Sequence, residues 1–337
     1  RRVHGDVQSL MLNLLMTKRK TLFTSLLTII ISYILPSLPS ADLRVGFYND
    51  QCPQAEPIVS NAVASAAQSN PGISAQLLRL HFHDCFVDGC DGSVLIDVGS
   101  QSEKNANAHQ GLNGFEVIED AKAQLEVVCP GVVSCADILA LAARDGIALA
   151  NGPVYDVPTG RRDGFVSDRS RAANMPEVDD PIQTLQSKFA RKGFSNEELV
   201  LLSASHTIGT AACFFMDNRL HKFSPESTSD PTINPQFFNE LEATCPQGGD
   251  VNVRLAMDRG SEFVFDRSIM QNMRDGFAVL ASDARLYEDS SIRGIVDFLL
   301  DGSTFESDYA DAIVKLGQLE VLTGFDGEIR QVCSSFN

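Results

Sequence analysis

Residues 79–93 read Arg-Leu-His-Phe-His-Asp-Cys-Phe-Val-Asp-Gly-Cys-Asp-Gly-Ser, and this stretch holds several candidate functional residues close together. Arg79 and His83 are four residues apart, so a helix places both side chains on one face. A neutral imidazole beside a fixed guanidinium can accept a proton and stabilise developing negative charge, which suits cleavage of an O–O bond. Phe82, between them in sequence, can restrict access to that face. The alternative is a capped helix end with a histidine whose hydrogen bonds are satisfied and which has no catalytic role. For an isolated Arg–His pair at this spacing we would favour that alternative.

The turn that follows His83 is rich in oxygen donors. Asp84, Asp91 and Ser93 supply side-chain oxygens, and a tight turn with glycines can aim backbone carbonyls inward. Because Ca²⁺ takes about 6–8 oxygen ligands, the turn predicts a calcium site. It lacks the ligand order of an EF-hand. The alternative is a polar turn closed by a disulfide between its two cysteines.

Two other histidine arrangements carry different predictions. His206 follows the apolar run 199–202 in the segment Ser-His-Thr-Ile-Gly. A single histidine there is more often a core residue than a ligand, and its alternative role is to bind one metal centre in a buried pocket. His81 and His83 are two residues apart, so on a helix they diverge by about 200° and cannot share a zinc ion. A zinc hydrolase is therefore the interpretation we rank last.

Composition excludes several classes of protein. The chain has 337 residues, of which 44% are hydrophobic and 21% charged, values typical of a globular protein with a core and not of a disordered chain. The formal net charge of −17 repels phosphate backbones, so we expect no nucleic-acid partner. No apolar run reaches the roughly 18 residues of a membrane-spanning helix, and we expect no span in the mature chain.

The first forty residues have the order of a secretory signal peptide. A basic stretch at 17–20 precedes a nearly apolar run at 22–35, and small or helix-breaking residues follow. The predicted segments are an upstream segment at 1–15, a signal peptide at 16–41 cleaved within 36–42, and one mature domain at 42–337. Secretion places the eight cysteines in an oxidising compartment, where disulfides persist.

Helical periodicity dominates the mature chain and predicts a mostly α fold with two helical lobes. One helix opens near Pro57, and Ser195 with Glu198 has the spacing of a capping box. A short strand is predicted at 155–157. The other predicted helices cover 73–83, 115–128, 136–150, 270–280, 291–300 and 305–322.

Taken together, these motifs resemble the secretory plant (class III) haem peroxidases. The resemblance covers about 47–333, nearly the whole mature chain. No single motif would suffice, but their combination in family order is highly specific. The motifs are residues 79–93, Val-Ser-Cys-Ala-Asp-Ile at 133–138, Gly-Arg-Arg-Asp at 160–163 and Ser-His-Thr-Ile-Gly at 205–209.

The resemblance implies the haem peroxidase fold for residues 42–337: mostly α-helix, two helical lobes around one haem b, and few short strands. It implies a secreted enzyme that reduces H₂O₂ to water and oxidises small phenolic donors in two one-electron steps. The expected location is the cell wall or apoplast, with the vacuole as the alternative. The expected assembly is a monomer.

The resemblance also assigns roles to single residues. It implies that His206 is the axial ligand of the haem iron and that Asp283 is its hydrogen-bond partner, which makes the imidazole more electron-rich. It implies that His83 is the proton acceptor and Arg79 the transition-state stabiliser. Phe82 would keep donors away from the iron, so that small reductants react at the haem edge.

Calcium ligands, donor contacts and disulfides are implied in the same way. Two Ca²⁺ ions are expected, and Ser261 stands where the family more often has threonine. The distal calcium set is Asp84, Val87, Gly89, Asp91 and Ser93, with Glu103 through water, and the proximal set is Thr207, Asp258, Ser261, Val264 and Asp266. The donor contacts would be Pro158 and Phe215. The disulfides would be Cys52–Cys129, Cys85–Cys90, Cys135–Cys333 and Cys213–Cys245.

Two questions stay open at the level of sequence. The family usually has an asparagine that supports the distal histidine, and here either Asn107 or His109 can hold His83 in its tautomer. The sequence does not identify the phenolic donor. A second interpretation is a haem- or calcium-stabilised, wall-associated binding protein with little turnover.

Overall fold

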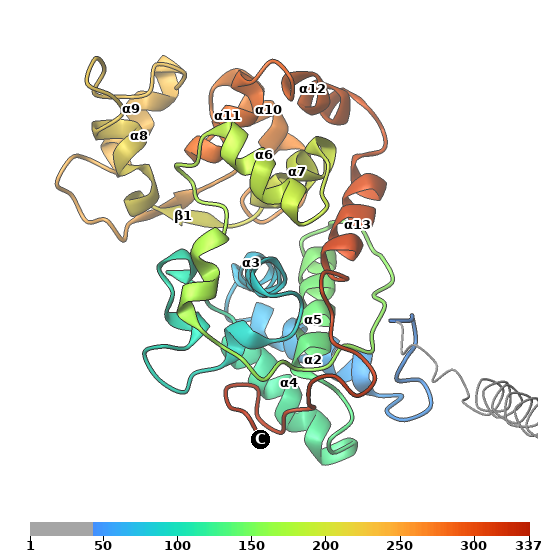
Figure 1. Ribbon diagram of the computed structural model, residues 1–337. Helices are drawn as coiled ribbons and strands as arrows, with labels where there is room; N and C mark the ends of the chain where they lie inside the picture. Colours follow the sequence, from blue (N-terminus) through green and yellow to red (C-terminus); the bar gives the residue numbers. More distant parts are fainter. Residues whose placement is uncertain (1–42) are drawn as a thin grey trace, which may run out of the picture. The chain divides into compact units, whose positions relative to one another are not determined.

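The computed structural model describes residues 43–337. The predicted signal peptide at 16–41 and the predicted upstream segment at 1–15 lie outside the described residues. Helices build the described part, and none of them is long and apolar enough to cross a membrane. Figure 1 shows α3 (Ile73–Val87) near the middle, between a lower and an upper group of helices.

The lower group forms the first lobe, and it fixes α3 from one side. Leu77 and Leu80 of α3 are fully buried in a core shared with the neighbouring helices, and α3 packs along α5. The elements of this lobe, besides α3, are α2 (Ala55–Ala67), α4 (Phe115–Val128), α5 (Cys135–Leu149) and the 3₁₀ turns η1 (Ser93–Leu95), η2 (Glu103–Asn105) and η3 (Asn107–His109).

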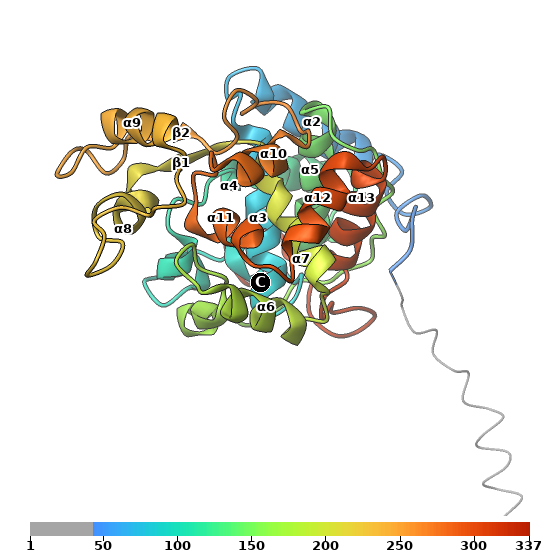
Figure 2. The same ribbon diagram turned by 90° about the horizontal axis from the view of Figure 1, so that it is seen from above.

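The upper group forms the second lobe, which includes a two-stranded antiparallel ribbon. In Figures 1 and 2, α8 and α9 lie on the opposite side from α13. Its elements are α6 (Ile182–Arg191), α7 (Asn196–Ser203), η5 (Ala204–Thr207), β1 (Thr210–Ala212), η6 (Cys213–Met216), α8 (Asp217–His221), α9 (Pro235–Thr244), β2 (Arg254–Ala256), α10 (Ser268–Asp275), α11 (Ala281–Glu288), α12 (Arg293–Asp301) and α13 (Phe305–Leu316). The 3₁₀ turn η4 (Arg169–Asn174) instead packs against α3, η2 and η3 of the first lobe.

The capping box predicted for α7 is present and leads the chain to His206. The amide of Glu198 donates to Ser195 Oγ at 3.1 Å, and the amide of Ser195 donates to Glu198 Oε2 at 2.7 Å. Both contacts satisfy amide groups at the helix start. The helix then tightens at Ser203 into the 3₁₀ turn η5, which carries His206. The capping box fixes where α7 begins, and because α7 is short, it also fixes the position of His206 in the turn that follows.

Several sequence predictions of secondary structure are wrong in detail. Residues 155–157 form no strand, and the ribbon strands lie instead at 210–212 and 254–256. The helix predicted at 270–280 ends at Asp275, because Gly276 adopts a positive φ of 78° that closes the helix. The last helix ends at Leu316 and not at 322, whereas α3 continues past His83 to Val87.

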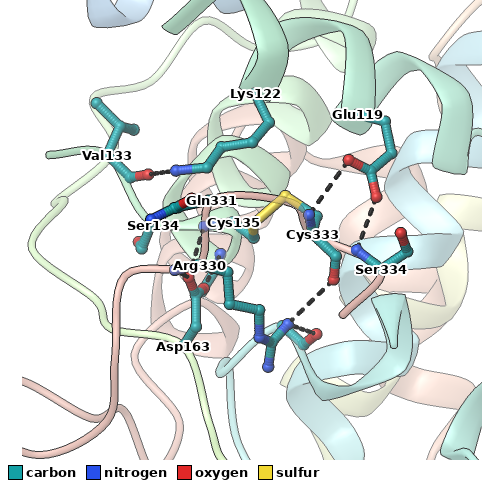
Figure 3. The surroundings of a disulfide bond; sticks show 12 residues. Glu119, Lys122, Val133, Ser134, Cys135, Asp163, Arg330, Gln331, Cys333 and Ser334 are labelled. Carbon is teal, nitrogen blue, oxygen red and sulfur yellow. Dashed lines mark hydrogen bonds between the residues drawn. A yellow bond between two sulfur atoms is a disulfide. The ribbon is translucent and has the colours of Figure 1, made fainter. Parts of the chain in front are cut away.

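The eight cysteines form the four expected pairs, and one pair anchors the end of the chain (Figure 3). The Cys135–Cys333 disulfide joins the C-terminal segment to the start of α5. Glu119 of α4 accepts hydrogen bonds from the amides of Cys333 and Ser334 at 3.2 and 2.7 Å. Arg330 donates to the carbonyl of Gly92 at 2.7 Å, so the chain end also supports the turn after α3.

A buried ion pair explains the Gly-Arg-Arg-Asp motif. Arg161 Nη1 lies 2.7 Å from Asp137 Oδ1, and both side chains are at most 1% exposed. Tyr48 donates to the other carboxylate oxygen at 2.6 Å, and Arg161 also donates to the carbonyl of Gly317 just after α13. Because removing one partner of a buried pair leaves an uncompensated charge, this cluster holds α5 and the end of α13 in fixed positions.

Candidate active site

The face of α3 that carries Ala75, Arg79 and His83 is turned toward the segment of His206. Gly209, three residues after His206, has a φ of 97°, and a Cβ there would lie 2.6 Å from Cβ of Ala75. Only glycine permits this approach. Arg79 lies one helical turn after Ala75, and His83 lies two turns after Ala75. Both side chains are therefore directed to the space bordered by His206.

His206 is anchored on one side and open on the other. Its Nδ1 lies 2.9 and 3.0 Å from the two carboxylate oxygens of Asp283, which is 1% exposed. The His206 side chain is nevertheless 36% exposed, and its Nε2 has no hydrogen-bond partner within the described residues. Burial lowers the pKa of His206, but the Asp283 carboxylate outweighs it, so the net pKa is raised. The free nitrogen therefore borders open space.

His83 is supported by His109 and not by Asn107. The Nδ1 atoms of His83 and His109 are 2.7 Å apart, and Nε2 of His109 is 3.2 Å from Oε1 of Glu103. The side chains of His109 and Glu103 are completely buried, whereas Asn107 is exposed. Glu103, His109 and His83 thus form a series of two hydrogen bonds that supports His83 from the Nδ1 side of its ring.

The neighbourhood keeps both of these imidazoles neutral. Burial lowers the pKa of His83 well below its ordinary value, and the charges of Arg79, His109 and His206 lower it further. Burial and then the charge of Arg79 lower the pKa of His109 to about 4. A neutral imidazole has one donor and one acceptor nitrogen, so one of the two facing Nδ1 atoms donates and the other accepts. If Glu103 accepts from His109 Nε2, then His109 accepts from His83, and Nε2 of His83 is left as a base.

Arg79 stays charged beside this base. It is half-buried, and its Nη2 donates to the carbonyl of Gln110 at 3.1 Å. Burial and then the nearby charge of Arg254 lower its pKa to about 10. Phe82 lies edge-on to His83 with ring centroids 6.1 Å apart and stacks on Phe86. A fixed cation and an apolar ring therefore flank the imidazole.

The predicted distal calcium residues come from the last turn of α3, the turn that follows it, η1 and η2. Asp84, Ser93 and Glu103 are fully buried, and Asp91 is 7% exposed. Oγ of Ser93 and Oε2 of Glu103 have no partner among the described residues. Burial raises the pKa of Asp84, with contributions from the charges of Asp91 and Glu103. Crowded carboxylates and orphaned oxygens fit a divalent cation.

The two carbonyls of this predicted set belong to the last residue of α3, Val87, and to Gly89 in the turn that follows. The Val87 carbonyl accepts a hydrogen bond from Lys192 Nζ at 2.9 Å, and the Gly89 carbonyl accepts from the amide of Asp91 at 2.9 Å. A carbonyl oxygen has two lone pairs, so either can still face a cation. Within residues 43–337 no group of three or more His, Cys, Asp or Glu side chains is arranged to hold a metal ion, and both predicted calcium sets include hydroxyl and carbonyl oxygens besides carboxylates.

The predicted proximal calcium residues converge after His206. Oγ1 of Thr207 donates to Asp258 at 2.8 Å, and Oγ of Ser261 donates to Asp266 at 2.5 Å. Both hydroxyl oxygens lie 3.5 Å from the carbonyl of Val264. Burial raises the pKa of Asp258 to about 7, and the charge of Asp266 adds to it. This set again concentrates oxygen donors and uncompensated acidic groups.

The structure does not bring every predicted residue to this site. Pro158 lines a cavity of about 10 Å³ with His81, Tyr155 and Arg161, at the face of α3 opposite to His83. Phe215 lies in η6 just after β1, half-buried against the core of the second lobe and edge-on to Phe214. Only Phe215 thus stays near the segment of His206.

Sequence reasoning missed two polar residues near the site. Asn272 of α10 donates to Asp258 at 2.5 Å and so belongs to the proximal oxygen set. Arg254 of β2 is close enough to affect the pKa of Arg79. No motif marks either residue, because both come close to the site only through the pairing of β1 with β2 and the packing of α10.

Comparison with known proteins agrees with this geometry. A family model described as Peroxidase matches residues 59–301. The chain is 61% identical to Peroxidase 43 of Arabidopsis thaliana over 303 residues, which cover 88% of this chain and 93% of that protein. It is 52% identical to Peroxidase 13 of Arabidopsis thaliana, with 88% and 94% covered, and 47% identical to Peroxidase N1 of Nicotiana tabacum, with 87% and 90% covered. The chain belongs to the peroxidase family, and the resemblance to its secretory plant members is confirmed.

Proposed function

We propose that this peroxidase reduces H₂O₂ to water at the space between His83 and His206 and takes the electrons from small phenolic donors. The observation that carries the proposal is the hydrogen-bonded chain Glu103–His109–His83 beside Arg79, opposite an imidazole whose outer nitrogen is free. A base and a fixed cation on one side and an anchored ligand nitrogen on the other are what peroxide cleavage at one iron requires.

His206 would hold haem b through Nε2. The open side of its ring and the Asp283 contact on Nδ1 fit an axial ligand, since a carboxylate partner fixes the tautomer and raises the basicity of the imidazole. When bound, the haem would store the two oxidising equivalents taken from the peroxide and pass them to the donors one at a time.

The residues of α3 move one proton and stabilise one charge. Nε2 of His83 accepts a proton from the first peroxide oxygen and returns it to the oxygen that leaves as water. The Arg79 guanidinium stabilises negative charge on that leaving oxygen. Two phenol molecules then each give one electron and one proton, so that the second oxygen also leaves as water and two phenoxyl radicals form.

Both calcium sets would be occupied in the active protein. A divalent cation among Asp84, Asp91 and Glu103 favours their ionised forms, although burial, with the charges of Asp91 and Asp88, raises the pKa of Glu103 to about 8. Ionised Glu103 accepts from His109 and so supports the acceptor role of His109 toward His83. The proximal ion would hold Thr207, directly after His206, against Asp258.

Removal of calcium is expected to slow the peroxide reaction several-fold and to lower the unfolding temperature. Asp84 directly follows His83, so its release loosens the end of α3, and a ligand held at 100 times its dissociation constant contributes about 2.7 kcal/mol to stability. Stopped-flow mixing with H₂O₂ before and after chelation measures the first effect. Ca²⁺ should restore the rate and Mg²⁺ should not, because Mg²⁺ demands a smaller octahedral site. Full activity with metal analysis showing no calcium would reject this role.

One set of spectra tests the function itself. Purified protein reconstituted with haem should show a Soret band, and the band should shift on addition of H₂O₂. Addition of a simple phenol should then bring the band back to its original position, and the phenol should be oxidised. A Soret band without any response to peroxide would instead favour the binding protein with little turnover. Protein that takes up no haem would contradict both interpretations.

The signal-peptide pattern at 16–41 supports an extracellular place of action. We propose that residues 16–41 act as the signal peptide, that 1–15 precede the true start, and that the mature enzyme works as a monomer in the wall space. Mass spectrometry of the native protein should find a first residue within 36–42, and peptides from 1–15 would contradict the assignment.

A further inference from the structure

One face of the β1–β2 ribbon presents a single charged side chain between small residues. In the antiparallel register Thr210 lies opposite Ala256 and Ala212 opposite Arg254. Residues directly opposite each other point to the same face, so these four side chains share one face. The other face carries Ala211 and Leu255, which pack into the core of the second lobe. The two alanine methyls leave room for a ligand group beside Arg254.

Arg254 is held in place but not neutralised. Its Nε donates to Thr210 Oγ1 at 2.8 Å, and its Nη2 donates to the Thr210 carbonyl at 2.6 Å. It makes no ion pair within residues 43–337, and its Nη1 has no hydrogen-bond partner there. The acidic chain, with a net charge of −17, thus leaves this exposed guanidinium without a carboxylate.

The ribbon places this guanidinium at the edge of the active site. Thr210 is four residues after His206, and the intervening Gly209 lies against Ala75 of α3, one turn before Arg79. The charge of Arg254 reaches Arg79 strongly enough to lower its pKa, after the larger effect of burial. Arg79 also makes no ion pair within the described part of the chain. Two like charges held near one another are unfavourable unless an anion lies between or beside them.

We propose that Arg254 binds a carboxylate at the rim of the active site and that this carboxylate is a propionate of the haem. The inference rests on the proposed function. Haem b carries two propionates on one edge of the ring, and a planar guanidinium is suited to a carboxylate. A phenolic acid donor could offer the same group, so the experiment has an arm for each source.

The first arm measures haem retention and not activity. Holoenzyme is mixed with an excess of apo-globin, and the rate of haem transfer is followed by absorption. Arg254→Gln should lose haem about tenfold faster than the unchanged protein, the size of one charge-assisted hydrogen bond. Arg254→Lys should recover part of the difference. Arg191→Gln, which removes an exposed arginine at the end of α6, is the matched charge control and should change nothing.

Esterified haem distinguishes the loss of a contact with the propionate charge from a general disturbance of the haem pocket. With haem dimethyl ester, whose propionates are neutral, Arg254→Gln and the unchanged protein should lose the cofactor at the same rate. Equal rates with ordinary haem as well would overturn the assignment to a propionate. A faster loss that persists with the ester would also overturn it, because the variant would then have disturbed the pocket and not a carboxylate contact.

The second arm compares two donors that differ in the carboxylate. Ferulate carries one and coniferyl alcohol carries a hydroxyl in its place. The propionate assignment predicts that Arg254→Gln changes KM for both donors equally. A rise in KM for ferulate alone, with unchanged haem loss, would assign Arg254 to the donor and overturn the propionate. Failure of the proposed function looks different, since the unchanged protein would then show no peroxide response at all.

Discussion

Replacing His83 with leucine is expected to slow the reaction with H₂O₂ by about 10²–10⁴-fold, the usual range for loss of a positioned general base. Leucine fills much of the same buried volume but cannot accept the peroxide proton. The proposal assigns haem binding to His206, which is hydrogen-bonded to Asp283 and not to His83, so the Soret band should remain. Stopped-flow measurement of the first step gives the rate directly.

The partner variant Arg79→Leu should slow the same step by about 10²–10³-fold, because one preorganised charge stabiliser is lost while the base remains. Arg79→Lys keeps the charge and should lie between. The rate of the unchanged enzyme should be flat between about pH 5 and 8, since burial and then Arg79 lower the pKa of His83 and keep the imidazole neutral there. An unchanged first step in either leucine variant would contradict the assigned role.

The sequence predicts the helices and the two faces of the site well, for reasons visible in single residues. The spacing of Arg79 and His83 needs only a helix to bring them together, and α3 provides it. The capping box at Ser195 marks the start of α7 and so the place of His206. These signals are local, and local geometry is enough to interpret them.

Other features depend on contacts that no local signal contains. Residues 155–157 have the composition of a strand but no partner strand, so they stay irregular. The ribbon that does form joins residues 210–212 to 254–256, more than forty positions apart. Arg254 and Asn272 reach the site only through such pairing, and Pro158 lies beside His81 because its segment turns toward α13. Long-range packing decides all of these.

The choice between Asn107 and His109 shows most clearly that local sequence signals do not determine tertiary contacts. Both residues lie in η3, two positions apart, and either offers an acceptor for His83. The 3₁₀ turn buries His109 against Glu103 and leaves Asn107 exposed, and this small difference in direction decides which residue supports the base.

Two substitutions at His109 are expected to separate rate from stability. In His109→Asn, the amide oxygen occupies nearly the place of Nδ1, so the hydrogen bond from His83 survives while the contact with Glu103 is lost. In His109→Gln, the amide nitrogen occupies nearly the place of Nε2, so the contact with Glu103 survives while His83 loses its acceptor. The two hydrogen bonds of the chain Glu103–His109–His83 are thus removed one at a time.

His109→Asn should react with H₂O₂ at nearly the unchanged rate but lose about 1–3 kcal/mol of stability, because a buried carboxylate is left unsatisfied. His109→Gln should keep the stability and lose about 10–100-fold in rate, because His83 is no longer held in the tautomer that leaves Nε2 free. Stopped-flow mixing and thermal unfolding of the same holoprotein samples measure both quantities. Equal losses of rate in the two variants would mean that His109 acts through packing alone, since a tautomer effect requires the acceptor at one position and not at the other.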